Sequence, residues 1–278
     1  MNIKIVYFSQ TGNTRKVANT FRKTFAEAGH NARIISLKKA NQPDFEQADV
    51  IGFGTPCFSG HAPTPVRNFL KMLPDLGGKK AFVFATSGGA PGRVLYDLNR
   101  LVSAKGARVI GGFLTRGELY HPVPCLIGRM KGRPNAQDLE KARRFALAIL
   151  EHLGVDRPDP MPESRPDTFE PGKGFYDMVS IISTDGFLRL MMPEPKLQQD
   201  RCNLCNWCVE QCPTDNITVN DYPVLGDHCI RCYRCLTGCP EKAYSVNWLI
   251  GNLAAWSFYN TWFERWFGDL EPGEKIYG

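Results

Sequence analysis

Eight of the ten cysteines form two copies of one spacing pattern toward the C-terminal end of the sequence. Each copy has three cysteines at three-residue steps and then a fourth cysteine that directly precedes a proline. The copies are Cys202, Cys205, Cys208 and Cys212-Pro213, and Cys229, Cys232, Cys235 and Cys239-Pro240. Their offset is constant, since 229 − 202 and 239 − 212 both equal 27. A constant offset indicates an internal duplication.

Three cysteines at this spacing can curl around one iron–sulfur cubane, while the cysteine before the proline points to the other cluster. This predicts one [4Fe–4S] cluster on Cys202, Cys205, Cys208 and Cys239, and a second on Cys229, Cys232, Cys235 and Cys212. Two alternatives are weaker. Zinc sites use cysteine pairs and need no third cysteine or Cys-Pro, and disulfides need an oxidising compartment. Residues 196–247 resemble the bacterial two-cluster ferredoxins, which implies a small α+β domain and low-potential, one-electron transfer.

A second group of chemically suited residues lies near the N-terminus, in a loop of hydroxyl and amide side chains with one glycine. Its residues are Ser9, Gln10, Thr11, Gly12, Asn13 and Thr14. The N–H groups and the dipole at a helix N-terminus bind anions such as phosphate. Taken alone, the loop fits a phosphate site and an ordinary capped helix, with Asn13 or Thr11 as N-cap, equally well.

The elements that must position this loop alternate between strand and helix over residues 1–153. Apolar runs of strand length predict five strands, and periodic apolar stripes predict the helices between them. The predicted strands are 3–8, 33–37, 50–54, 80–86 and 107–114, and the predicted helices are 14–28, 66–73, 93–104 and 136–153. This alternation predicts an α/β fold, a doubly wound parallel sheet with helices on both faces.

Two further loops follow the third and fourth predicted strands. They contain Thr55, Pro56, Cys57 and Phe58, and Thr86, Ser87, Gly88 and Gly89. In a doubly wound sheet, ligands bind at the carboxyl ends of the strands, where all three loops are expected. The Ser-x-Thr-Gly-x-Thr pattern and these loop positions resemble the flavodoxins. The resemblance implies one FMN, with its phosphate on residues 9–14 and its isoalloxazine at the other two loops. Phe58 would supply a stacking ring, while residues 88–89 supply no aromatic side chain.

The predicted domain ranges follow from these patterns and from composition. They are an FMN-binding domain at 1–153, a Pro-rich linker and apolar strap at 154–195, a two-cluster ferredoxin domain at 196–247, and an aromatic tail at 248–278. The tail has apolar residues at three- and four-residue steps, which predicts one broad helical stripe. Packing onto the protein is the first interpretation of that stripe, and a partner surface or a membrane-surface contact are the alternatives.

The order of the domains resembles the fused flavodoxin–ferredoxin electron-transfer proteins of anaerobes. The resemblance implies that low-potential electrons are relayed between two clusters, FMN and a partner, with a ferredoxin-type donor and an acceptor enzyme. The alternative is a flavin-dependent reductase of a small molecule, fed through its clusters. No catalytic residues are predicted, and no Gly-x-Gly-x-x-Gly follows a strand, so no nicotinamide site is readable.

Composition and charge limit the classes of protein to which the chain can belong. A hydrophobic content of 43% permits a packed core. The formal net charge of +6 is offset when the cofactors are counted: two clusters add roughly −4 and a flavin phosphate roughly −2, so nucleic-acid binding is not expected. No secretory signal follows Met1, and no apolar run has the length of a membrane span, so a cytoplasmic location is expected.

Overall fold

The computed structural model describes residues 1–39, 45–89, 91–154, 180–181 and 185–256. Its contacts divide the chain into two compact units. The first unit contains Met1–Glu118 and resumes with Met130–Ile181, and the second contains Leu119–Arg129 and Ile182–Leu270. The predicted ranges treat 1–153 as one continuous domain, whereas the structure groups Leu119–Arg129 with the cysteine-rich unit. The chain therefore crosses from the first unit to the second and back before its cysteine motifs begin.

The first unit is built on a five-stranded parallel sheet with the order β2-β1-β3-β4-β5. Its strands are β1 (Asn2–Tyr7), β2 (Asn31–Ser36), β3 (Val50–Pro56), β4 (Lys80–Ser87) and β5 (Arg108–Arg116). The strand order reverses at β1 and β3, which is the topological switch point where doubly wound sheets bind ligands. The predicted fold class of this part is confirmed.

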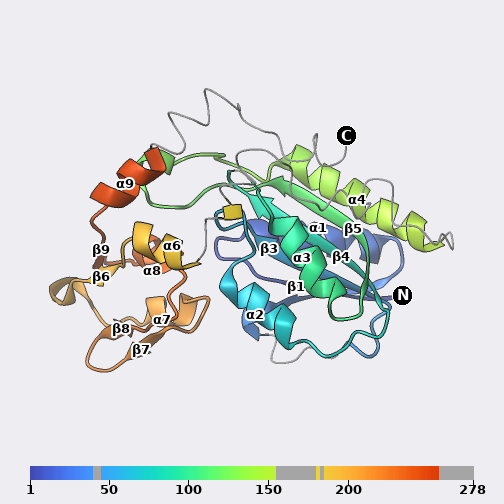
Figure 1. The fold of residues 1–278 in the computed structure, drawn as a ribbon, viewed down its shortest axis with the longest axis horizontal. Coiled ribbons are helices and arrows are strands. Elements are labelled where there is room, and N and C mark those ends of the chain that lie inside the picture. The colour runs from blue at the N-terminus through green and yellow to red at the C-terminus, as the bar shows by residue number, and fades with distance from the viewer. Residues whose placement is uncertain (40–44, 90, 155–179, 182–184, 257–278) are drawn as a thin grey trace. The chain divides into compact units, whose positions relative to one another are not determined.

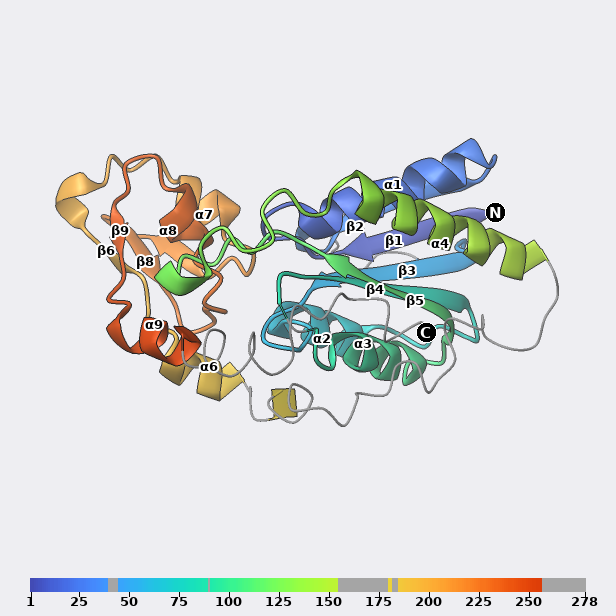
Figure 2. The same ribbon diagram turned by 90° about the horizontal axis from the view of Figure 1, so that it is seen from above.

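Helices cover both faces of the sheet. Helices α1 (Asn13–Glu27) and α4 (Ala136–Gly154) lie on one face, and α2 (Thr64–Met72) and α3 (Val94–Ser103) lie on the other (Figures 1 and 2). Helix α2 begins two residues before its predicted start, with a proline in its first turn. Proline is tolerated there because the first N–H groups of a helix have no partner within the helix.

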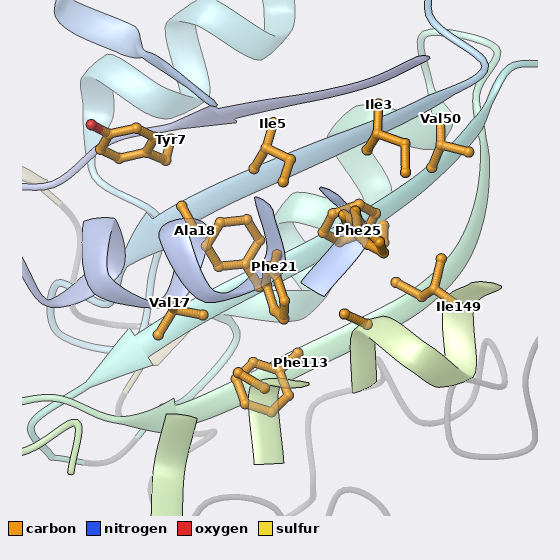
Figure 3. Close-up of a cluster of buried hydrophobic side chains, with 14 of the residues drawn as sticks. Ile3, Ile5, Tyr7, Val17, Ala18, Phe21, Phe25, Val50, Phe113 and Ile149 are labelled. Carbon is orange, nitrogen blue, oxygen red and sulfur yellow. The ribbon is translucent and has the colours of Figure 1, made fainter. Parts of the chain in front are cut away.

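An aromatic core fills the space between the sheet and helices α1 and α4. Its centre is Phe21 of α1, whose ring centroid lies 5.6, 5.0 and 5.6 Å from those of Phe82, Phe84 and Phe113, all in edge-on geometry. Such edge-to-face contacts are favoured by the charge distribution of aromatic rings. Figure 3 shows side chains from β1, α1, β5 and α4 pointing into this space. The packed core fixes the ends of the strands, so the loops that follow them begin from defined positions.

The second unit consists of short elements around the cysteines. Two antiparallel ribbons pair β6 (Lys196–Leu197) with β9 (Tyr244–Ser245), and β7 (Ile217–Val219) with β8 (Pro223–Leu225). Its helices are α6 (Asp185–Met191), α7 (Trp207–Gln211), α8 (Arg234–Gly238) and α9 (Leu249–Trp256). Short 3-10 turns occur at Pro124–Leu126 and Gln199–Arg201 here, and at Leu37–Lys39 in the first unit. The expected small α+β domain is present.

Parts of the predicted linker, strap and tail, at 155–179, 182–184 and 257–278, lie outside the described residues. The described start of the tail is helical, as predicted. The side chains of Leu249, Ile250 and Leu253 in α9 are exposed, while Trp248, directly before the helix, packs against Val123 and Leu126. Among the helices that can be described, none combines the length and the apolar character needed to cross a membrane.

Candidate functional site

The first predicted loop connects the end of β1 to the start of α1. Gly12 is the N-cap of α1, with a φ of 101°, and as a glycine it has no side chain to cap the helix. The Ser9 hydroxyl turns back under the loop and accepts the Gly12 N–H at 3.1 Å and the Arg15 N–H at 3.4 Å. Because Gly12 occupies the cap, the alternative with Asn13 or Thr11 as N-cap is wrong. The loop still presents backbone N–H groups and the positive end of the helix dipole, which suit a phosphate.

The second loop leaves β3 and closes as a tight turn. Phe58 and His61 exchange backbone hydrogen bonds of 2.8 and 3.0 Å, and Ser59 and Gly60 between them both have positive φ. Positive φ at both central residues is the geometry of a two-residue type I′ turn. Phe58 is half-buried, so part of its ring surface is available for stacking against a flat ligand.

The third loop, after β4, is held by a buried arginine. The Ser87 hydroxyl donates to the Gly89 carbonyl at 2.8 Å, and Arg116 Nη1 donates to the same carbonyl at 2.8 Å. Arg116 is only 3% exposed, so a positive charge lies directly behind the loop. Sequence patterns do not single out Arg116, because one arginine at the end of a strand carries no signature of its own.

The fold brings these three loops together at one edge of the sheet. They follow β1, β3 and β4, which are neighbours around the switch point. The Cys57 N–H donates to the Thr86 carbonyl at 2.8 Å, and the buried hydroxyls of Thr14 and Thr86 lie 2.9 Å apart. The loops of the predicted FMN site therefore form one connected surface, while the contacts of individual residues with a flavin stay a prediction.

The cysteine-rich unit contains two hollows, each lined by four cysteines. One hollow is lined by Cys202, Cys205, Cys208 and Cys239. The other is lined by Cys212, Cys229, Cys232 and Cys235. Each set takes three cysteines from one motif and the fourth from the other, which is the grouping that the spacing predicts. Within the described chain, no three Cys, His, Asp or Glu side chains converge where a single metal ion would bind.

The two motifs share a backbone conformation as well as a spacing. Three non-glycine residues in each copy have positive φ, and they match at the same offset as the cysteines: Leu204, Asn206 and Asp215, and Arg231, Tyr233 and Lys242. The sulfur of Cys212 accepts the Asn216 N–H at 3.3 Å, and the sulfur of Cys239 accepts the Ala243 N–H at 3.4 Å. Positive φ is costly outside glycine, so its repetition at matching positions shows that the duplication extends to the structure.

Comparison with known proteins identifies the first unit and part of the second. Residues 4–150 match the Flavodoxin domain family, and residues 195–218 match the 4Fe-4S binding domain family. The chain belongs to the flavodoxin domain family. The 4Fe-4S match contains the first cysteine motif, and the second motif lies beyond it.

The relatives of this flavodoxin-domain protein cover its N-terminal part. An uncharacterized protein of Methanocaldococcus jannaschii is 30% identical over 143 residues, which are 50% of this chain and 91% of that protein. The flavodoxin of Megasphaera elsdenii is 31% identical over 112 residues, which are 39% of this chain and 82% of that protein. The solved structure of an archaeal flavodoxin aligns with 55% of this chain and 99% of its own, with a TM-score of 0.45 and 19% identity. A flavodoxin domain joined to a 4Fe-4S domain makes this chain an iron–sulfur flavoprotein of electron transfer, for which FMN and a [4Fe–4S] cluster are implied.

In this flavodoxin domain, a charged pair supports the second loop. His61 Nδ1 lies 2.7 Å from a carboxylate oxygen of Asp97 in α3, and Nε2 lies 2.5 Å from the Ser180 carbonyl. Both partners are hydrogen-bond acceptors, so this geometry favours the imidazolium, which can donate from both ring nitrogens. The hydrogen bond to Asp97 raises the pKa of His61. Sequence patterns do not pair these residues, because 36 positions separate His61 from Asp97 and 119 separate it from Ser180.

Burial favours the thiol form of Cys57 in the same loop. Burial raises the pKa of Cys57 to about 11, so the side chain stays protonated at neutral pH. Its Sγ donates to the Pro91 carbonyl at 3.4 Å, which connects the second loop to the segment that leads into α3. Cys57 therefore helps to fix the shape of the predicted flavin site through a hydrogen bond.

Beside the second cysteine motif, the segment Leu119–Arg129 contributes to an aromatic cluster. Tyr233 is 1% exposed and donates from its hydroxyl to the Pro193 carbonyl at 2.7 Å. The rings of His121 and Trp248 lie 4.9 and 4.8 Å from its centroid. Burial lowers the pKa of His121 to about 4, so this imidazole is neutral at pH 7. The sequence offers no signal for this cluster, because its three members come from distant segments.

Proposed function

We propose that this protein relays low-potential electrons between two [4Fe–4S] clusters and one FMN, and exchanges them with partner redox proteins. The observation that carries the proposal is the pair of four-cysteine hollows in a chain that also has a flavodoxin domain. When bound, iron–sulfur clusters exchange single electrons and a flavin exchanges one or two. A chain with both cofactors can collect single electrons and deliver them singly or as a pair.

The backbone duplication supports the second cluster. A motif that had lost its cluster would be free to lose the costly positive φ values at Arg231, Tyr233 and Lys242. The second hollow is lined by four cysteines, as the first is. Both cysteine sets therefore offer the four thiolates that a cubane needs.

The three loops of the first unit support FMN. The phosphate would be held by N–H and hydroxyl groups of residues 9–14, at a helix N-terminus whose N-cap residue is a glycine. The ring would lie against the loops at Thr55–Phe58 and Thr86–Gly89, where Phe58 offers a stacking surface and Arg116 holds the backbone in place. These residues bind and orient the cofactor, and none of them acts as an acid or a base in the proposal.

The partners follow from the cofactors. A small, low-potential iron–sulfur protein of the ferredoxin type is the natural electron donor for a cubane, and an enzyme that needs reducing equivalents is the natural acceptor. The sequence pattern of a nicotinamide site is absent, which supports a protein donor. The competing proposal is a flavin-dependent reductase of a small molecule, and it differs in needing no protein acceptor.

Composition tests the cofactors first. Anaerobically prepared protein should contain about eight irons, about eight acid-labile sulfides and one FMN per chain. Cys202→Ser and Cys229→Ser should each damage a different cluster, and Thr11→Asp should abolish FMN binding because it places a carboxylate at the phosphate. An iron content near four, bound zinc, or unchanged FMN in Thr11→Asp would contradict the corresponding part of the proposal.

Stopped-flow mixing tests the relay. Oxidised protein is mixed anaerobically with reduced ferredoxin, NADH or NADPH, and flavin bleaching is followed. Reduced ferredoxin should bleach the flavin quickly, and Cys229→Ser that retains FMN should be slower. Fast bleaching by NADH or NADPH, undiminished in Cys229→Ser, would show instead that the protein is a nicotinamide-dependent flavin reductase.

A further inference from the structure

The two cysteine hollows are alike in backbone and unlike in charge. Between the first three cysteines of each motif, the first copy has Asn203, Leu204, Asn206 and Trp207, and the second has Ile230, Arg231, Tyr233 and Arg234. The first copy thus carries no charge between its cysteines, while the second carries two arginines. Reduction makes a cluster one unit more negative, so nearby fixed charge bears directly on its potential.

Arg231, the first of these two arginines, is largely shielded from water. Its side chain is 14% exposed, and its Nη2 donates to a carboxylate oxygen of Glu194 at 3.1 Å. Its Nε and Nη1 atoms are buried and have no hydrogen-bond partner in the described chain. Arg231 lies two residues after Cys229 and directly before Cys232, which are both predicted ligands of the second cluster.

The matching position in the first motif is Leu204, which shares the positive φ, at 59° against 53° for Arg231. Leu204 is 46% exposed and brings no charge. Since leucine is accommodated in this backbone conformation at one site, leucine at the other is a conservative test of the charge alone.

The hydroxyl contacts of the two hollows largely balance. The Tyr244 hydroxyl donates to Cys208 Sγ at 3.4 Å in the first set, and the Thr214 hydroxyl lies 3.6 Å from Cys212 Sγ in the second. The backbone N–H contacts to Cys212 and Cys239 also match. The charged residues that line the two hollows differ. The first hollow is lined by Glu241, at the position that Thr214 occupies in the other motif. The second hollow is lined by Arg234, at the position that Trp207 occupies in the other motif.

The carboxylate of Glu194 reduces the effect of the Arg231 charge without removing it. Glu194 is paired with Arg231 but is 46% exposed, against 14% for the arginine. Water screens an exposed carboxylate more strongly than a guanidinium shielded by protein. The positive charge of Arg231 is therefore only partly offset by Glu194, while the exposed Glu241 adds a negative charge at the first hollow.

We propose that Arg231 makes the cluster of Cys212, Cys229, Cys232 and Cys235 the more easily reduced of the two. The proposal rests on the two-cluster function above. An electron from a ferredoxin-type donor protein adds to one cluster, the donor is oxidised by one electron, and the electron settles at the cluster beside Arg231. Electrons then pass through the first cluster and remain on the second, so electron transfer within the pair runs from the first cluster to the second.

A redox titration followed by electron paramagnetic resonance tests the assignment, on anaerobic protein with about eight irons. Two reduced-cluster signals should appear at different potentials. Arg231→Leu should lower the higher potential by at least about 59 mV, a tenfold change in the one-electron equilibrium, and leave the lower one in place. Arg231→Lys should retain most of the difference, because it keeps the charge.

Two variants with the opposite expected sign separate charge from packing. Glu194→Gln should raise the higher potential by less than Arg231→Leu lowers it, and Leu204→Arg should raise the lower potential. If Arg231→Leu loses iron, Glu194→Gln and Leu204→Arg still test whether nearby charge sets the difference between the two potentials. Three results would overturn the proposal. They are unchanged potentials, a fall in the lower potential in Arg231→Leu, and equal decreases of the higher potential in Arg231→Leu and Arg231→Lys. An iron content near four in the unaltered protein would instead overturn the two-cluster function.

Discussion

The flavodoxin unit and the cysteine-rich unit differ in where their cores come from. In the first, buried phenylalanine and aliphatic side chains fill the space between a five-stranded sheet and two helices. In the second, the buried core contains Cys208, Ile217 and Tyr244, with Cys212, Cys235 and Cys239 packed against it, and its strands have two or three residues. A small domain with so few buried apolar side chains needs another source of stability, such as bound metal.

This difference bears on how each cofactor site forms. The predicted flavin loops begin from strands that an apolar core already holds, so we expect their shape not to depend on the flavin. The cysteine hollows are bounded by the predicted ligands themselves, so we expect their shape to depend on the clusters. The expected contrast is between a site formed before its cofactor binds and a site formed together with its cofactor.

Removing iron is the strongest test of that contrast. Treatment with a chelator and an oxidant should abolish the fixed structure of residues 196–247, because binding and folding are coupled there. Hydrogen exchange followed by mass spectrometry should show lost amide protection in β7 and β8. The amides of β1, β3 and β4 serve as the internal control and should stay protected. Retained protection in β7 and β8 after iron loss would break the contrast.

Phe21→Ala should be the largest single-residue effect on the flavodoxin unit. It removes the ring that contacts Phe82, Phe84 and Phe113, and should lower the free energy of unfolding by about 3–5 kcal/mol. Urea denaturation of the flavin-free protein would measure it, with the cluster absorbance unchanged. The matched control is Leu147→Ala on α4, which is 39% exposed and should change stability by at most about 0.5 kcal/mol. Equal effects of the two variants would contradict a core-dependent unit.

Gly54→Ala tests how tightly the sheet packs behind the flavin loops. Gly54 pairs with Phe84 across β3 and β4, and an added Cβ would overlap the Phe84 ring. The variant should cost about 1–3 kcal/mol, as overpacked cores do. Gly154→Ala is the control, since a Cβ there meets nothing within 4 Å. Thermal unfolding would compare the stabilities of the two variants. If Gly54→Ala is as stable as the wild type, the sheet accommodates the added Cβ more easily than its close packing against Phe84 indicates.

His61 should make the stability of the flavodoxin unit depend on pH, with a smaller effect. Its pKa is raised in the folded state by Asp97 and by the Ser180 carbonyl, against burial and the charge of Arg67. The folded state therefore binds the proton more tightly. The contribution is complete below the unfolded pKa of 6.5 and is lost as pH rises through the higher folded value. The slope cannot exceed about 1.4 kcal/mol per pH unit for one group.

Urea denaturation of wild type and His61→Gln between pH 6 and pH 9 would measure this dependence. The wild type should lose stability over that range, and the variant should show a flatter profile, because glutamine cannot carry the proton. Parallel profiles would remove His61 as the cause, and a wild type that gains stability over the same range would contradict the sign.

The sequence by itself was sufficient for the features that depend on local spacing. The alternation of apolar runs and helical stripes predicted the parallel sheet and its covering helices, because each pattern reflects one face of one element. The ends of the elements are predicted less accurately. Strand β5 extends to Arg116, beyond the predicted end at Leu114. Helix α2 includes Pro65, which lies just before the predicted helix at 66–73. The repeated cysteine spacing predicted which four cysteines line each hollow, since chain geometry limits how a short loop can surround a cubane.

The tertiary structure alone decided the contacts between distant segments. His61 meets Asp97 and Ser180, Arg116 supports the loop at Gly89, and Leu119–Arg129 supplies His121 to the ring of Tyr233. It also decided that Arg231 is shielded from water while Leu204, at the matching position, is exposed. Periodicity reports only which face of an element is apolar. Which side chains meet across the fold, and how much water reaches a charge, depend on how separate elements pack, and short-range sequence does not encode that.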